Sequence, residues 1–172
     1  EDTRAAHEVT GAQFAAYPHI PTMEGLMNNA SGGNLADNAL ELVKIAEQIM
    51  PWVLALLERE KPDYVIFDSL CSWAKQATEK LGIRAAGSIS TFVIAPGAMP
   101  PVPVSFLLSM AASLVPRLPA YWQVASRMKR NFGVKGVGLA GALSNSGAMN
   151  IVYTSSLFQP GSEKLNGAYK FV

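Results

Sequence analysis

Apolar residues recur at three- and four-residue steps from position 34 to position 57, which predicts a long amphipathic helix. The apolar stripe consists of Leu35, Ala39, Leu42, Val43, Ala46, Ile49, Met50, Val53, Leu56 and Leu57. Pro51 lies inside this stripe. Because proline lacks an N–H and clashes with the preceding turn, we expect it either to kink the helix or to begin a second one.

Short apolar runs alternate with helical spacing further along the chain. Tyr64–Phe67 is a continuous apolar run, which is typical of a parallel strand covered on both faces. The spacing over residues 69–81 predicts a helix that stops at Gly82, and residues 83–89 predict the next strand. A strand–helix–strand unit with such short connections has parallel strands and a right-handed crossover.

The remaining segments complete an α/β pattern. We expect helices over 1–10, 104–115 and 120–132, strands over 13–17 and 149–154, and loops over 18–33 and 135–147. Strands that alternate with helices build a Rossmann-like layered domain with a mostly parallel sheet. Residues 1–172 are enough for one domain with a proper core that needs no disulfide or metal.

Charged residues are sparse and unevenly placed. The chain is 49% hydrophobic and 16% charged, with a net charge of +1. Twelve of its thirteen acidic residues lie at or before Glu79, and the thirteenth is Glu163. The basic residues between these two acids are Lys80, Arg84, Arg117, Arg127, Lys129, Arg130 and Lys135. This basic, apolar middle section suits an anionic or membrane-proximal partner, and the alternative is a solvated helix face. We expect no nucleic-acid partner.

The longest uncharged stretch covers residues 85–116 and contains five prolines. Its clean apolar piece, residues 104–115, is far shorter than the roughly 20 residues that a membrane-spanning helix needs. We therefore expect no membrane span. The single cysteine, Cys71, excludes a disulfide within the chain and is compatible with a cytoplasmic location.

The sulfur and imidazole groups are weak candidates for chemistry. Cys71 falls in the first turn of a predicted helix, where the helix dipole can lower a thiol pKa. Its apolar neighbours favour the alternative, a buried structural thiol. His7 and His19 are isolated and lack metal-ligand spacing to a second His or Cys. We therefore expect neither a metal nor a cofactor in this chain.

Asp68 is the strongest candidate for a functional carboxylate, because it directly follows the apolar run Tyr64–Phe67. Ligands of open parallel sheets bind in the crevice beyond the carboxyl ends of the strands. There Asp68 would orient a histidine base by accepting a hydrogen bond from its far nitrogen. The alternative is that Asp68 caps the helix that follows, since Asp is favoured at that position. The residues alone leave both interpretations open.

An apolar segment after the next strand supplies candidate binding residues. They are Thr91, Phe92, Phe106, Leu107 and Met110. A loop and short helix lined by Phe and Met would accept a large hydrophobic ligand adaptably. The alternative is that these side chains fill the core.

Three segments together resemble a known family. KPDYVIFDSLCSWAKQATEKLGI (residues 61–83) resembles the middle of the N-terminal domain of UDP-sugar-dependent glycosyltransferases, with the greatest likeness to the bacterial macrolide glycosyltransferase group. MNIVYTSSLFQPGSEKLNGAYKFV (residues 149–172) is similar to the end of that domain. HEVTGAQFAAYP (residues 7–18) is similar to its second-helix-to-strand passage. The likeness covers nearly the whole chain in matching order.

The resemblance implies the N-terminal lobe of a two-lobed GT-B fold, which binds the acceptor while the other lobe binds the nucleotide sugar. In that family a histidine after the first strand deprotonates the acceptor hydroxyl, an aspartate orients it, and the attack inverts the anomeric centre without a metal. Asp68 matches the position of that aspartate. The expected reaction moves a sugar from a UDP-sugar co-substrate to a macrolide or flavonoid type of acceptor.

Parts of the family pattern are missing from the sequence. The first strand, the histidine that follows it and the donor lobe have no counterpart, so we expect a fragment that is inactive by itself. The expected partners are a hydrophobic acceptor and a donor lobe in the same or another chain. A homodimer through an exposed sheet edge is a further expectation. The alternative function is a non-catalytic acceptor-binding or membrane-associating half that pairs with a separate donor-lobe chain.

Overall fold

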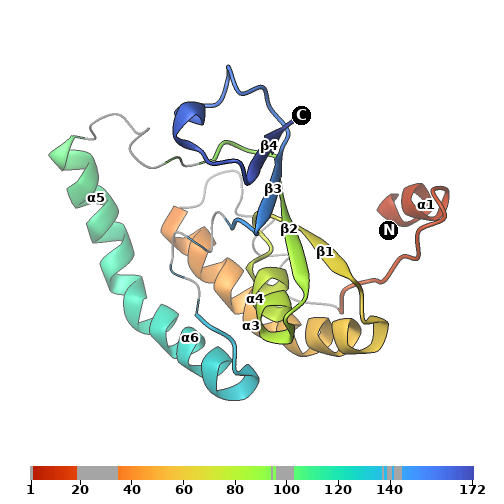
Figure 1. The fold of residues 1–172 in the computed structure, drawn as a ribbon. Coiled ribbons are helices and arrows are strands. Elements are labelled where there is room, and N and C mark those ends of the chain that lie inside the picture. Colours follow the sequence, from red (N-terminus) through yellow and green to blue (C-terminus); the bar gives the residue numbers. More distant parts are fainter. Residues whose placement is uncertain are drawn as a thin grey trace.

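The computed structural model describes residues 2–18, 35–93, 95, 103–136, 138, 141 and 145–172. Its helices and strands in chain order are α1 (Asp2–Glu8), α3 (Leu35–Glu60), β1 (Tyr64–Asp68), α4 (Ser72–Leu81), β2 (Arg84–Ile89), α5 (Val104–Leu114), the 3-10 turn η1 (Val115–Arg117), α6 (Leu118–Phe132), β3 (Met149–Val152), the 3-10 turn η2 (Ser162–Lys164) and β4 (Tyr169–Phe171). The α/β class predicted from the sequence is confirmed (Figure 1).

The four strands form one parallel sheet in the order β1-β2-β3-β4. Asp68 pairs with Ser88, and Ile89 pairs with Val152. The predicted strand–helix–strand unit is therefore present, although α4 begins at Ser72 rather than at residue 69. Its predicted stop is confirmed, because Gly82 adopts a left-handed conformation with φ 68°. The carboxyl ends of the strands meet at the upper side of Figure 1, where the end marked C lies.

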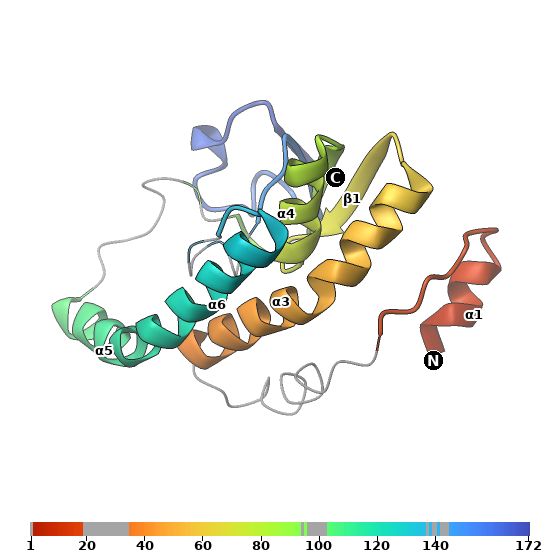
Figure 2. The same ribbon diagram turned by 90° about the horizontal axis from the view of Figure 1, so that it is seen from below.

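The main core lies among three helices, with α4 joining them to the sheet. Contacts join α3 to α4 and to α6, and α4 to β1 and β2. Figure 2 shows α6 lying along α3. The buried residues of this cluster are Ala39, Leu40, Val43, Ile45, Ala46, Ile49, Met50, Val53, Leu54, Leu57, Trp73, Ala77, Tyr121, Val124, Met128 and Val134. Burial of this apolar surface is the main force that holds the three helices together.

No second helix begins at Pro51, which was one of the two expected outcomes. α3 runs as one helix of 26 residues with Pro51 inside it. Interior proline costs about 3 kcal/mol in a helix. Pro51 itself is exposed, while Ile49 and Met50 before it and Val53 and Leu54 after it are all buried. Burial of apolar residues on both sides of the proline outweighs its local cost.

Strand β1 is covered on one face only, within the part of the chain that the structure describes. Phe67 is 3% exposed, whereas its neighbour Ile66 is 55% exposed and Tyr64 is 65% exposed. Successive side chains of a strand point to opposite faces, so Phe67 faces the helices and the other two face away. The expectation that this strand is covered on both faces is therefore wrong for the described residues.

The N-terminal segment also differs from the prediction. Residues 13–17 form no strand. Instead Tyr17 packs its ring against Trp52 of α3 and Trp73 of α4, with ring centroids 5.1 and 6.5 Å apart. The predicted loop over residues 18–33 lies almost wholly outside the described residues, as does His19.

A long helical arm consists of α5, η1 and α6. The helical conformation continues through Pro116 and Pro119, where two separate helices were expected. The stretch Val104–Phe132 is long and apolar enough to cross a membrane by length and composition alone. However, α6 packs on α3 through Tyr121, Val124 and Met128, whose spacing places them on one helix face. Thus the second half of the arm is part of the protein core.

Two ion pairs fasten α6 and the turn before it to α3. Arg117 donates to both carboxylate oxygens of Asp37, and Arg127 donates to both carboxylate oxygens of Glu47. In each pair the Nη2–Oδ2 or Nη2–Oε2 distance is 2.7 Å. Such two-point contacts fix geometry as well as charge. They bring the basic middle section against acids from the first part of the chain.

Candidate functional site

The residues that follow β1, β2 and β3 come together at the carboxyl edge of the sheet. Because the strands are parallel and adjacent, their ends lie side by side. Asp68 ends β1, Thr91 and Phe92 follow β2, and Tyr153 and Phe158 follow β3. All five side chains are exposed. The structure therefore places Asp68, Thr91 and Phe92 at one edge, as the sequence predicts.

Asp68 organises the turn between β1 and α4 but does not cap the helix. Its Oδ1 accepts a hydrogen bond of 2.8 Å from the Leu70 N–H, and its carbonyl oxygen accepts one of 2.8 Å from the Cys71 N–H. The N-cap residue of α4 is Cys71, which makes no side-chain capping bond. The capping interpretation is therefore wrong. An aspartate that bonds the N–H two residues later forms an Asx turn, and Asp68 remains exposed in this turn.

The backbone next to Asp68 is held from two sides. Ser69 donates its N–H to the carbonyl of Ser88 at 3.0 Å. The Ser69 carbonyl accepts from the backbone N–H and the side-chain Nδ2 of Asn145, at 2.8 and 3.1 Å. Ser69 and Asn145 are each 2% exposed. This buried network fixes the position of Asp68 without contacting its carboxylate, which remains open to solvent.

A buried glutamine joins the loops that follow β2 and β3. The side-chain amide of Gln159 accepts from the Val93 N–H at 2.9 Å and donates to the Val93 carbonyl at 2.8 Å. Just before these residues, the rings of Phe92 and Phe158 stack with centroids 6.2 Å apart and planes 22° apart. Phe158, Gln159 and Asn145 were not among the residues predicted from the sequence, because their contacts join segments 66 or more positions apart.

The other predicted binding residues lie elsewhere. Phe106, Leu107 and Met110 are on α5, and all three are exposed. Both views show α5 standing away from the sheet (Figures 1 and 2). The structure therefore does not bring them together with Thr91 and Phe92 at the carboxyl edge, and an acceptor-binding role for these residues stays a prediction.

Cys71 has the properties of a structural thiol. Burial, together with the nearby charge of Asp68, raises its pKa to about 11 from an ordinary value of 9.0. The helix dipole would act in the opposite direction, so desolvation outweighs it at this helix start. Cys71 is half-buried against the main core, so its role as a structural thiol stays a prediction.

The described residues offer no cluster of three or more His, Cys, Asp or Glu side chains that could hold a metal ion. His7, on α1, stacks its ring on Phe14 with centroids 6.0 Å apart. The contact that the structure shows for this histidine is therefore local ring packing.

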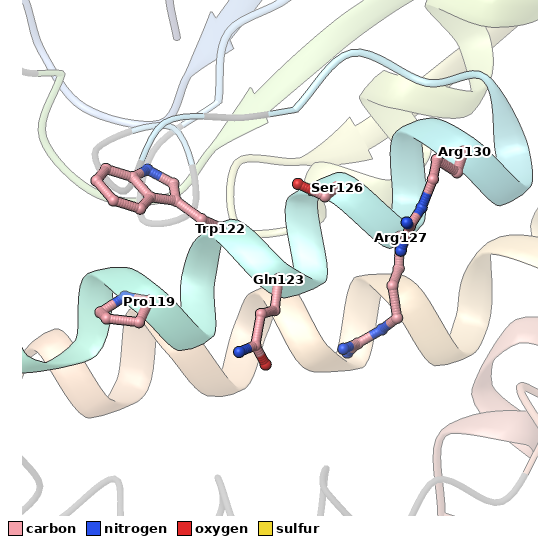
Figure 3. Close-up of a pocket in the computed structure, with 6 residues that line it drawn as sticks. All are labelled: Pro119, Trp122, Gln123, Ser126, Arg127 and Arg130. Carbon is pink, nitrogen blue, oxygen red and sulfur yellow. The ribbon is translucent and has the colours of Figure 1, made fainter.

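A shallow hollow lies along α6, away from the carboxyl edge. Figure 3 shows its lining, which consists of Pro119, Trp122, Gln123, Ser126, Arg127 and Arg130. In the same view Arg127 reaches toward α3, where it pairs with Glu47. Trp122 is 60% exposed. The hollow has a cationic and aromatic lining but no acid or base suited to proton transfer from a hydroxyl.

Comparisons with known proteins agree with this architecture. No known family profile matches the chain. Its sequence is 34% identical over 92 residues to the NDP-glycosyltransferase YjiC of Bacillus licheniformis, a match that covers 51% of this chain and 23% of that protein. Two solved structures share its fold over 99% of the chain with a TM-score of 0.68 each: the glycosyltransferase of kitacinnamycin at 18% identity and the calicheamicin glycosyltransferase CalG4 at 15% identity.

The chain spans 41% of the length of each of these two structures. The fold likeness covers the parallel sheet, its helices and the loops at the carboxyl edge, while the sequence match extends over about half of the chain. The chain therefore has the fold of part of a GT-B glycosyltransferase and is related in sequence to an NDP-glycosyltransferase.

Proposed function

We propose that residues 1–172 form the acceptor-binding part of an inverting glycosyltransferase. The complete reaction moves a sugar from a UDP-sugar to a hydroxyl of a hydrophobic small molecule of macrolide or flavonoid type. A donor lobe, in the same or another chain, holds the UDP-sugar. One observation carries the proposal: an exposed carboxylate, Asp68, stands at the carboxyl edge of a parallel sheet whose fold matches glycosyltransferases over 99% of the chain.

In this proposal Asp68 is a positioning residue for a histidine base supplied by another segment. A carboxylate that accepts a hydrogen bond from the far nitrogen of a histidine fixes its tautomer and stabilises the cation formed on proton abstraction. The Asx turn uses Oδ1 of Asp68. Among the described residues, Oδ2 accepts no hydrogen bond, which leaves one oxygen for such a partner. The rigid backbone at Ser69 limits how far the carboxylate can move.

Binding measurements on the 172-residue chain test the first part of the proposal. We expect the chain to bind hydrophobic hydroxylated acceptors in isothermal titration calorimetry, and neither to bind UDP-glucose nor to hydrolyse it. The reason is that the carboxyl edge belongs to the acceptor side, whereas the nucleotide sugar requires the donor lobe. Transfer of glucose by the purified chain alone would contradict the assignment of acceptor and nucleotide sugar to different lobes.

The role of Asp68 needs a protein that joins this chain to a donor lobe. There we expect Asp68→Asn to lower kcat by about 10²–10⁴-fold, with little change in the acceptor KM, because the amide presents the wrong hydrogen-bonding pattern to the base. Asp63 provides a matched control: it is an exposed carboxylate just before the opposite end of β1. If Asp68→Asn and Asp63→Asn have equal small effects, the positioning role is refuted.

We propose peripheral contact with an anionic membrane surface as a second function of the same chain. All described residues of α5 are exposed or half-exposed, including Phe106, Leu108 and Met110 at 54%, 65% and 41%. Arg117 and Arg127 of the arm are paired with acids of α3, whereas Lys129 and Arg130 at the end of α6 are exposed and add positive charge to its surface. Apolar helices flanked by cations bind at the headgroup boundary of anionic bilayers, which fits the cytoplasmic leaflet and the proposed cytoplasmic location.

Vesicle sedimentation tests this second function. We expect the chain to bind vesicles that contain about 30% phosphatidylglycerol in phosphatidylcholine more strongly than vesicles of pure phosphatidylcholine. The phosphatidylglycerol gives the vesicles the negative charge of an anionic leaflet. Leu108→Ser should weaken this binding, because it removes apolar area from α5. Leu157→Ser is the control, since Leu157 is 97% exposed but lies in the loop after β3. Equal binding by the chain and Leu108→Ser would rule out α5 as the contact.

A further inference from the structure

Two phenylalanine rings form an exposed stacked pair at the carboxyl edge. Phe92 follows β2 and is 52% exposed, and Phe158 follows β3 and is 74% exposed. Their ring planes are 22° apart, and their centroids are 6.2 Å apart. Large apolar rings normally lose solvent contact on folding, so a pair that remains this exposed offers apolar area to a ligand.

Gln159 holds the backbone beside the pair through hydrogen bonds, and Val93 also packs in an apolar cluster with Ile89 and Val152. Gln159 is 3% exposed, and its amide both accepts from and donates to the backbone of Val93, next to Phe92 in the chain. Its Nε2 also donates to the Pro160 carbonyl at 2.9 Å. Backbone N–H groups of Phe158 and Gln159 donate to the Ser155 carbonyl at 2.9 and 3.1 Å. Both rings therefore project from backbone that is fixed by hydrogen bonds.

We propose that Phe92 and Phe158 form a two-ring surface that binds a flat aromatic acceptor, and that Gln159 is the residue that positions the two rings. This rests on the proposed acceptor-binding function and narrows its substrate class from hydrophobic molecules in general to planar ones. Aromatic rings favour offset-stacked or edge-to-face neighbours at centroid separations of about 4.5–7 Å. Because the two rings are nearly parallel, one flat ligand can contact both of them, either along their edges or on a face. The Thr91 hydroxyl lies at the same edge and suits a hydroxyl group of such a ligand.

The test uses the full 172-residue chain and the flavonol quercetin as the probe in isothermal titration calorimetry. We expect Phe158→Ala to weaken binding about three- to tenfold, which is the value of one aromatic contact. Phe158→Tyr should retain the affinity, because it keeps the ring. Leu157→Ala is the matched control: Leu157 is 97% exposed, adjacent in the chain, and should leave the affinity unchanged.

The positioning role of Gln159 is tested by a double-mutant cycle. Gln159→Met should weaken quercetin binding, whereas Gln123→Met, at an exposed site on α6, should not. If Gln159 acts through the rings, Phe158→Ala combined with Gln159→Met binds no more weakly than Phe158→Ala alone, within about twofold. A further loss in the double variant would overturn the positioning role and leave Gln159 as a general structural residue.

Two outcomes separate this inference from the proposed function. If the chain binds quercetin and Phe158→Ala binds it equally well, the ring pair is refuted while acceptor binding stands. If the chain binds a macrolide but not quercetin, the ring pair is refuted while acceptor binding stands; if it binds neither, both proposals fall. Should Gln159→Met not fold, hydrogen exchange of the Val93 amide replaces it, because this N–H donates to Gln159. Slow exchange of the Val93 amide supports the hydrogen bond to Gln159, and exchange as fast as in the unfolded chain overturns the positioning role.

Discussion

Replacing Gly87 by alanine should destabilise the chain through a contact between β2 and the entry to β3. A Cβ at position 87 would lie 2.5 Å from Oδ1 of Asn150 and 3.3 Å from the backbone nitrogen of Gly147. Asn150 is 1% exposed, and its amide accepts from the Gly147 N–H at 2.8 Å and donates to the Gly147 carbonyl at 3.1 Å. The new methyl group would push this amide away from both partners.

The size of the effect follows from these contacts. Overpacking a well-filled site costs about 1–3 kcal/mol, and each weakened hydrogen bond about 1 kcal/mol. Replacing glycine lowers the entropy of the unfolded chain, which raises the free energy of unfolding by about 0.4–1 kcal/mol. We expect a net loss of about 2–4 kcal/mol in the free energy of unfolding. For a chain of this size this corresponds to a Tm lower by roughly 5–15 °C.

Thermal unfolding and urea titration, followed by circular dichroism, measure this loss. Gly167→Ala is the matched control, because a Cβ at Gly167 would meet nothing within 4 Å. We expect its free energy of unfolding to change by less than about 0.5 kcal/mol.

A second background isolates the contact. In a chain that carries Asn150→Ala, the amide that the methyl group would strike is gone, so Gly87→Ala should cost about 1 kcal/mol or less. The reasoning would be refuted by a Gly87→Ala variant as stable as Gly167→Ala, or by an equal loss in the Asn150→Ala background.

Three further outcomes test other parts of the structure. At pH 8, Cys71 should react with Ellman's reagent about a hundredfold more slowly than in urea, because a pKa of about 11 instead of 9.0 leaves far less thiolate; equal rates would contradict its burial. The Arg117 guanidinium holds the pKa of Asp37 below its ordinary value of 3.8, so the pair stabilises the fold above that value and loses this effect as the pH falls through the lowered pKa. Arg117→Gln should return the Asp37 carboxyl titration, followed by NMR, toward 3.8; an unchanged titration would show that the ion pair is not formed. If the chain dimerises through the open edge and uncovered face of β1, Ile66→Lys should convert it to a monomer in sedimentation velocity, and a dimer that persists would place the interface elsewhere.

Much of the local structure could be predicted from the order of residue types. The run Tyr64–Phe67, the helical spacing after it and the stop at Gly82 lie close together in the chain, and each acts through short-range geometry. Their order along the chain was enough to predict parallel strands, because short strand–helix–strand connections allow one arrangement. The placement of Asp68 at a carboxyl edge followed from the same argument.

The predictions that failed depended on burial. A second helix was one of the two outcomes expected at Pro51, but α3 continues through it, because apolar residues on both sides are buried and that gain outweighs the local cost of the proline. Tyr64 and Ile66 were expected to be covered, but the described helices pack on the opposite face of the sheet. An apolar side chain in a sequence does not show which neighbour will cover it.

The sequence by itself determined the α/β class, the parallel strand pair and the family likeness, because these depend on local periodicity and on the order of motifs. Only the tertiary structure decided that the Asp68 carboxylate forms an Asx turn instead of a cap. It alone showed that Gln159 clamps Val93 and that the rings of Phe92 and Phe158 stack. These contacts join residues about 66 positions apart, and such pairs meet only when neighbouring parallel strands bring their carboxyl ends to one edge.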